Sequence, residues 1–166
     1  MPRIATSFDP SAVAWRRVTD PTCTEFKVDF EYSLLGYDLT AGRLDMLLRY
    51  AKGRGHCRRH KHVALTVTLV LEGEQHLIEI QPDGTRRSIL RRKGEYALAP
   101  ADALPHLEHG GEAGGTVMLS MSAPDGILFE YLDENMQNGY RLSIQEFVEA
   151  WDKEVPFGTP LTTQAA

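Results

Sequence analysis

The chain contains little cysteine, with only Cys23 and Cys57 among its 166 residues. Two thiols are too few for the disulfide framework of a small secreted domain, and they suit a reducing compartment. No stretch approaches the roughly 18 apolar residues that a membrane-spanning helix requires. Residues 1–14 also lack the basic start and apolar run of a signal peptide. We therefore expect a cytoplasmic protein with no membrane partner.

Positive charge is also in deficit, because 18 Lys and Arg residues face 23 Asp and Glu residues, for a net charge of −5. This is the wrong sign for a dedicated nucleic-acid-binding protein, so we expect no nucleic-acid partner. The content of hydrophobic residues, 42%, is close to the average for globular proteins. We expect residues 1–158 to form a single domain and residues 159–166 to form a flexible tail.

Histidine is absent before residue 56 and after residue 109, and all six copies lie between these positions. They are His56, His60, His62, His76, His106 and His109. Imidazole is a common metal ligand and titrates near neutral pH, so this clustering is the feature most informative about function.

Short apolar segments recur along the chain, and glycine and proline separate them. We expect strands at 26–30, 43–50, 60–71, 76–81, 85–90, 95–99, 116–121 and 127–132. The tripeptide Pro82-Asp83-Gly84 predicts a hairpin turn, because glycine tolerates the positive φ of such turns. Strands and helices do not alternate, so the pattern predicts an all-β sandwich or barrel.

One helix is expected near the end of the sequence, at 143–153. Ser143 and Glu146 have the spacing of a capping box, in which each side chain satisfies a backbone donor at the helix start. The apolar positions Ile144, Phe147, Val148 and Trp151 follow helical periodicity. This stripe predicts a helix that packs against the barrel, and a helix that binds a partner is the alternative.

Two histidines are separated by one residue at the start of the longest predicted strand. Alternate side chains of a strand share a face, so His60 and His62 stand side by side with Cβ atoms about 7 Å apart. Imidazoles at that separation can converge on one metal ion. The pair therefore predicts a metal site that needs a third ligand from another segment.

His106 is the expected third ligand, because it follows the strand at 95–99 and a proline-containing loop. His109 is its rival, since it lies just past the same loop. His56 precedes the first pair by a short loop and is expected to be a loop residue, although it can also reach the site. His76 is expected to be structural or exposed. No catalytic residue beyond the metal ligands is evident.

The opposite face of the long strand is aliphatic, with Val63, Leu65, Val67, Leu69 and Leu71. Such a face is not left in water. The N-terminal strands, the terminal helix or a second subunit can cover it, and we expect a homodimer.

These residues resemble the two motifs of the cupin superfamily. The first motif corresponds to His60-Lys61-His62 and Gly73, and the second corresponds to Gly94, Pro100 and His106. The sequence departs from the pattern in having Thr66 where the first motif has a carboxylate, and Asp102 where the second has a glycine. The resemblance implies the double-stranded β-helix, or jelly-roll barrel, of cupins.

Segments 41–49, 59–62, 71–74 and 126–133 are similar to a narrower group of cupins. This group contains 2,4'-dihydroxyacetophenone dioxygenase, acetylacetone-cleaving dioxygenase and the cupin domain of the anti-sigma factor ChrR. The oxygenases of the group hold non-haem iron with three histidines and no carboxylate, and Thr66 fits that variant. The resemblance implies metal ligation by His60, His62 and His106.

The resemblance also implies a function, which is a dioxygenase that cleaves a small β-diketone or hydroxyaryl ketone. It implies one divalent metal ion per chain, with Fe²⁺ favoured for activity and Zn²⁺ or Ni²⁺ as alternatives. Three neutral imidazoles leave the charge of the ion uncompensated, so a small anionic carbonyl chelator is the expected substrate. The alternatives are a non-catalytic regulatory cupin of the ChrR type and a cupin isomerase or lyase that works without O₂.

Overall fold

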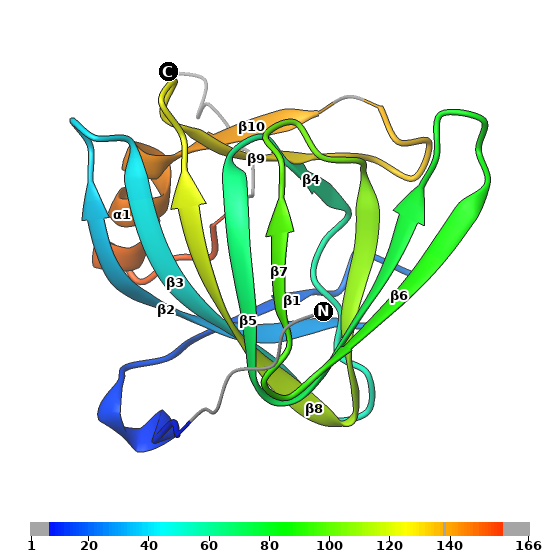
Figure 1. Cartoon of the computed structure of the whole chain (residues 1–166), viewed down its shortest axis with the longest axis horizontal. Coiled ribbons are helices and arrows are strands. Elements are labelled where there is room, and N and C mark those ends of the chain that lie inside the picture. The colour runs from blue at the N-terminus through cyan, green and yellow to red at the C-terminus, as the bar shows by residue number, and fades with distance from the viewer. Residues whose placement is uncertain (1–6, 138, 158–166) are drawn as a thin grey trace.

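The computed structural model of the chain describes residues 7–137 and 139–157. In this part of the chain, ten strands form one curled sheet, and one α-helix packs at its side (Figure 1). The strands are β1 (Arg16–Asp20), β2 (Val28–Asp38), β3 (Arg43–Tyr50), β4 (His60–His62), β5 (Leu65–Ile80), β6 (Arg86–Arg92), β7 (Tyr96–Ala99), β8 (His106–Ser122), β9 (Ile127–Tyr131) and β10 (Tyr140–Ser143). A short 3₁₀ helix, η1 (Pro10–Ala12), precedes them, and α1 (Ile144–Asp152) follows. The predicted all-β barrel with a C-terminal helix is confirmed.

The strands that pair in the sheet all run antiparallel, and β8 is the most connected of them. β8 pairs with β3 along one edge and with β5 along the other, and at its first residue it also pairs with β4. Long strands that change partners along their length curl the sheet into a barrel (Figure 1). β8 and β4 thereby bring two distant parts of the sequence together at one point of the barrel wall.

The long strand expected at 60–71 is divided in the structure. The backbone N–H groups of Val63 and Ala64 both donate to the carbonyl of Leu128, which separates β4 from β5. The expected end of the strand at residue 71 is wrong, because β5 continues to Ile80 and includes most of the separate strand expected at 76–81. Gly73 adopts a φ of +62° at a bulge, so that the strand shifts register there without ending.

Two further strands and half of another were not expected from the pattern. β1 and β10 are short, and each has only one aliphatic residue. Their pairing with β2 and β9, which the local sequence does not show, makes them strands. The first half of β8 contains four glycines between residues 110 and 115, which disguise it as a loop. The expected strand at 116–121 is only its second half.

The C-terminal helix begins as predicted. The Ser143 side chain accepts from the backbone N–H of Glu146, and the Glu146 side chain accepts from the backbone of Ser143, which completes the capping box. The helix buries Ile144, Phe147 and Ala150, and the Phe147 ring packs edge-on against Tyr32 of β2 at 5.3 Å between centroids. This confirms that the helix packs against the barrel. Among the described residues, no helix has the length and apolar character needed to cross a membrane.

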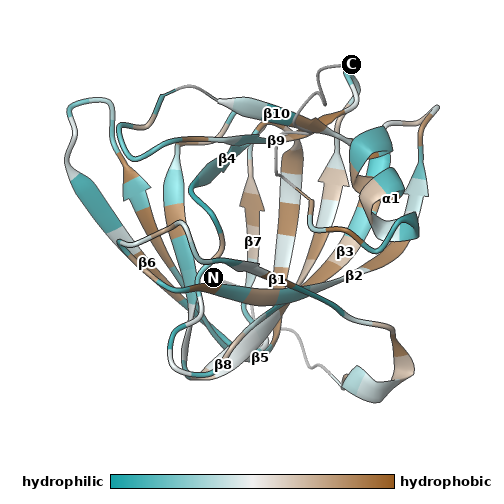
Figure 2. Ribbon diagram, turned by 180° about the vertical axis from the view of Figure 1, so that it is seen from behind, coloured by the Kyte–Doolittle hydropathy of each residue, from teal (hydrophilic) through white to brown (hydrophobic). Residues whose placement is uncertain are grey.

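The inner face of the barrel carries the core, and apolar bands follow the strands in Figure 2. The even positions from His60 to Val70 are all buried, as the alternation predicted. On the outer face, Val63, Val67 and Leu69 are only half-buried and Leu65 is 37% exposed.

Candidate metal centre

Four side chains that can ligate a metal converge on the inner face of the barrel. His60, His62, His106 and Glu108 each place one ligand atom within 4.8 Å of the others, and all four residues are buried. His60 and His62 lie on β4, His106 and Glu108 lie on β8, and His60 is paired with His106 in the sheet. Each strand thus contributes two side chains at alternate positions, which share one face.

The outer ring nitrogens of two of these histidines are fixed by backbone carbonyls. His60 Nδ1 lies 2.7 Å from the Arg58 carbonyl oxygen, and His106 Nδ1 lies 3.1 Å from that of Leu104. A carbonyl only accepts hydrogen bonds, so each Nδ1 carries the proton. An imidazole with its single proton on Nδ1 has a lone pair on Nε2.

Thr66 fixes the third ring in the same way. Its hydroxyl donates to the Ala64 carbonyl at 3.0 Å, so its oxygen accepts from His62 Nδ1 at 2.9 Å. The residue that replaces the motif carboxylate is therefore not a ligand in this arrangement. It orients the ligand His62 instead.

The inward nitrogens face one another without protons between them. His60 Nε2 and His62 Nε2 are 3.2 Å apart, and His106 Nε2 is buried without a hydrogen-bond partner. Burial and the neighbouring His106 lower the pKa of His60 to about 4, and burial and His60 lower the pKa of His62 well below its usual value. These two rings are neutral at pH 7, so opposed lone pairs meet in a buried space. A cation at their centre removes this repulsion, and neutral imidazole is the form that binds metals.

Glu108 adds a carboxylate to the histidines. Its Oε2 lies 3.5 Å from His60 Nε2 and 3.4 Å from His106 Nε2. Burial raises the pKa of Glu108, but contact with His106 and the charge of the histidines outweigh it, so the pKa falls well below its usual value. Glu108 is therefore ionised, and its negative charge faces the same point as the imidazole lone pairs.

The group of potential ligands thus contains a carboxylate that was not expected from the sequence. Glu108 lies two residues after His106, beyond the second motif, and not at the position occupied by Thr66. The signal was the sequence His106-Leu107-Glu108, which repeats the alternate spacing of His60-Lys61-His62. It was missed because the glycine-rich segment that follows hid the strand.

The other three histidines lie outside this group and stack on one another. The His109 ring lies 4.7 Å from that of His56 and 4.7 Å from that of His76, between centroids, and Phe26 stacks on the far side of His56 at 4.3 Å. His109 is one position out of phase with His106 and Glu108, so it belongs to the opposite face of β8. Neither His109 nor His56 joins the group of potential ligands found among the described residues.

A narrow cavity of ≈ 20 Å³ lies beside His60 and Glu108 in the barrel. Cys57 and apolar side chains such as Phe129 line it. Burial, and to a lesser extent the charge of Glu108, raises the pKa of the Cys57 thiol well above its usual value. The free Cys57 is therefore a neutral thiol.

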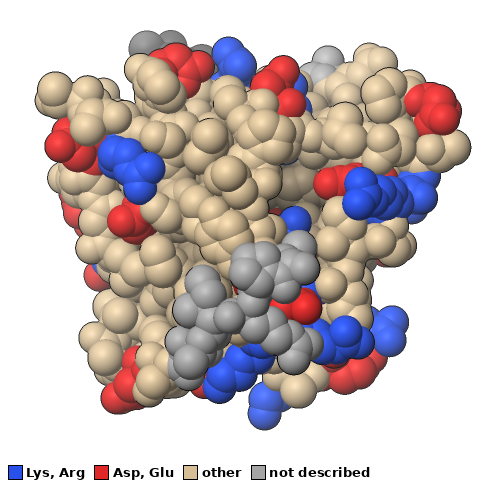
Figure 3. All heavy atoms as spheres, viewed as in Figure 1, with Lys and Arg blue, Asp and Glu red and all other residues tan. Residues whose placement is uncertain are grey.

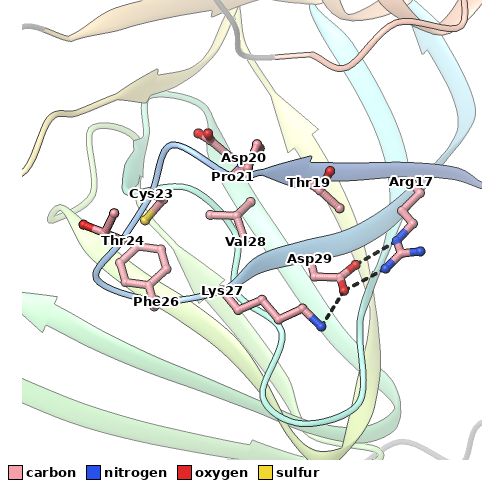
Figure 4. Close-up of a pocket in the computed structure, with 10 residues that line it drawn as sticks. All are labelled: Arg17, Thr19, Asp20, Pro21, Cys23, Thr24, Phe26, Lys27, Val28 and Asp29. Atoms are coloured by element: carbon pink, nitrogen blue, oxygen red, sulfur yellow. Dashed lines mark hydrogen bonds and ion pairs between the residues drawn. The ribbon is translucent and has the colours of Figure 1, made fainter.

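A larger hollow of ≈ 530 Å³ lies along β1 and the start of β2 (Figure 4). No histidine is among its lining residues, and its charged side chains are paired. Arg17 and Lys27 both contact the Asp29 carboxylate, at 2.9 and 3.0 Å (Figure 4). This hollow is separate from the group of potential metal ligands.

No family model matches the chain, and no curated protein matches it. Solved structures do match it over most of its length. An RmlC-like cupin protein from Ralstonia eutropha JMP134 aligns over 90% of this chain and 87% of its own, with a TM-score of 0.64 and 14% identity. An acetylacetone dioxygenase from Acinetobacter johnsonii aligns over 93% and 94%, with a TM-score of 0.63 and 11% identity. A candidate acetylacetone dioxygenase from Methylibium petroleiphilum PM1 aligns over 91% and 97%, with a TM-score of 0.63 and 13% identity. At these identities the likeness concerns the fold.

Proposed function

On the premise that this chain has the cupin fold, as the motifs implied, we propose that it binds one divalent metal ion through His60, His62, His106 and Glu108. The observation that carries the proposal is the set of inward atoms. Three Nε2 atoms and one carboxylate oxygen face a common point, two of these nitrogens are only 3.2 Å apart, and the third, His106 Nε2, is buried without a hydrogen-bond partner. Buried polar atoms in folded proteins are rarely left in this state.

The ligand set favours a transition metal over Ca²⁺ or Mg²⁺. Three imidazoles with one carboxylate suit iron, zinc or nickel, whereas Ca²⁺ and Mg²⁺ prefer oxygen ligands alone. When bound, such an ion supplies Lewis acidity and open positions for oxygen donors. The protein holds the ring orientations through the Arg58 and Leu104 carbonyls and the Thr66 hydroxyl, and all four residues are buried.

The finer proposal is a non-haem dioxygenase that cleaves a small β-diketone or hydroxyaryl ketone, with Fe²⁺ as the active metal. Its support is the shared fold of two proteins described as acetylacetone dioxygenases, together with the three histidines. Glu108 leaves a divalent ion with a net charge near +1 in place of +2. A small anionic chelator, such as the enolate of a β-diketone, still complements that charge.

A second candidate is a non-catalytic metal-binding cupin with a regulatory role. The observation in its favour is the size of the cavity beside His60 and Glu108. At ≈ 20 Å³ it has room for about one water molecule and not for a ketone.

Metal analysis and oxygen consumption test both candidates. We expect about one metal atom per chain in the wild type and in His76→Ala, and almost none in His62→Ala, because His76 lies outside the ligand group. Oxygen uptake by the iron-loaded protein with a panel of β-diketones and hydroxyaryl ketones supports the dioxygenase, and one iron per chain without uptake supports the regulatory protein. A wild type that contains no metal after growth with iron and zinc contradicts the metal site itself.

A further inference from the structure

The oxygen of Glu108 that faces away from the histidines is held by two donors. Oε1 accepts hydrogen bonds from the Tyr50 hydroxyl and from Gln75 Nε2, the latter at 2.8 Å. All three residues are only 2% exposed. A buried carboxylate with one oxygen so bound has only its other oxygen, Oε2, free to face the ligand group.

The orientation of the Gln75 amide is fixed from its far end. Arg91 Nη1 donates to Gln75 Oε1 at 2.9 Å, and Arg91 lies directly opposite Gln75 in the pairing of β5 with β6. A guanidinium has no acceptor, so it binds only the oxygen end of the amide. The NH₂ end must then point at Glu108 and Tyr50, as it does.

The Tyr50 hydroxyl is fixed as a donor by its surroundings. Its oxygen contacts Glu108 Oε1, and a carboxylate oxygen only accepts hydrogen bonds, so the phenol is the donor of this pair. Gln75 Nε2 also donates to the Tyr50 oxygen, at 3.2 Å, which leaves the phenolic proton directed at Glu108. Both donors are therefore committed to the same carboxylate oxygen.

From this arrangement we propose that Tyr50 and Gln75 are positioning residues that hold Glu108 as a single-oxygen ligand. The inference rests on the proposed metal site and deepens it. A carboxylate can bind a metal through one oxygen or through both. With Oε1 withheld by Tyr50 and Gln75, Glu108 would supply one oxygen to the ion and not two, and the coordination position spared in this way would be available to an oxygen donor of a chelator.

Cobalt(II) tests this without any assay of turnover. Visible absorption of Co²⁺ weakens as its coordination number rises, and azide titration of the Co²⁺ protein measures access to open positions. In Tyr50→Phe and Gln75→Leu we expect Glu108 to bind through both oxygens. The visible absorption then falls, and the dissociation constant of azide rises about 10-fold or more, as is typical when a group that orients a metal ligand is removed.

Matched variants separate positioning from general disturbance. Tyr37 is 50% exposed at the end of β2, so Tyr37→Phe is expected to keep the wild-type spectrum and azide affinity. Arg91→Met frees the Gln75 amide to turn and should reproduce part of the Tyr50→Phe effect, whereas Arg92→Met, at an exposed neighbour on β6, should not. Circular dichroism of the metal-free proteins establishes that each variant is folded.

The outcomes distinguish this inference from the proposed function. Failure of the wild type to bind Co²⁺ overturns the metal site. Binding by the wild type, with the same spectrum and azide affinity in folded Tyr50→Phe and Gln75→Leu, overturns the positioning role alone. A folded Tyr50→Phe protein that binds no Co²⁺ also contradicts it, because the three histidines and Glu108 remain available.

Discussion

At the scale of single residues, Thr66 and Glu108 together explain how the site departs from the motif it resembles. Thr66 occupies the position of the motif carboxylate, but its hydroxyl is used to fix the protonated nitrogen of His62. The negative charge has moved to another strand, where Glu108 provides it. Comparison with the motif, position by position, shows only that the motif carboxylate is absent at Thr66. The folded sheet shows that the Glu108 carboxylate lies beside the histidines.

His56 gives a prediction about pH. Burial, with a contribution from His109, lowers the pKa of His56 from 6.5 to about 4. The unfolded chain therefore binds a proton at a higher pH than the folded protein does, and the free energy of unfolding falls as the pH drops from 6.5 towards 4. The metal-free His56→Phe protein retains an aromatic ring in the stack but has no group that titrates there. We expect its free energy of unfolding to fall by about 1–3 kcal/mol less than that of the wild type over this pH range. Urea unfolding at several pH values measures it, and parallel curves for the two proteins contradict it.

At the scale of the elements, the alternation of residues along a strand predicted which face of the sheet a side chain lies on better than it predicted where a strand ends. The inward set of His60, His62 and Thr66 follows from a period of two, and so does the outward position of Leu65. The division between β4 and β5 does not, because it depends on the Leu128 carbonyl, which lies far away in the sequence. Long-range pairing of this kind leaves no local trace, and for the same reason Tyr50 and Gln75 could not be assigned to the site before the structure was known.

The bulge at Gly73 supports a prediction about stability. A Cβ at Gly73 would lie 2.5 Å from the Gly114 carbonyl oxygen, and the φ of +62° also disfavours a side chain. Gly84 has a φ of +82°, but a Cβ there would meet no atom within 4 Å, so it is a matched control. We expect Gly84→Ala to cost about 1 kcal/mol, from its backbone conformation alone, and Gly73→Ala to cost at least about 3 kcal/mol. If chemical denaturation gave equal losses in the free energy of unfolding for the two variants, the bulge would accommodate a side chain without strain, and the prediction would be wrong.

At the scale of the whole molecule, one face of the barrel is largely apolar. Leu65, Val67 and Leu69 of β5 lie beside Leu98 of β7 and Met118 of β8 in the pairing of the sheet. Leu98 is 56% exposed. Where no grey atoms cover it, the area over β8, β5 and β7 is mostly free of charged side chains in Figure 3. Two copies of such a face can meet without burying an unpaired charge, which favours a second copy of the chain over a charged partner.

We therefore propose a homodimer through this face. Leu98→Lys places a charge at its centre, and we expect light scattering to give the mass of one chain for this variant and of two chains for the wild type. Leu90 is 38% exposed on β6, away from the face, so Leu90→Lys is expected to remain dimeric. A wild-type mass of one chain would remove the proposal.

The pairing of β4 with β8 also determines when during folding the metal can be bound. Each strand alone offers only two ligands, and the two strands come from distant parts of the sequence. Until the barrel has closed, a chain therefore presents half-sites that hold a metal weakly. Metal retention thus reports the pairing of β4 with β8, and a chain in which these strands have not yet paired has no complete site with which to trap the wrong ion.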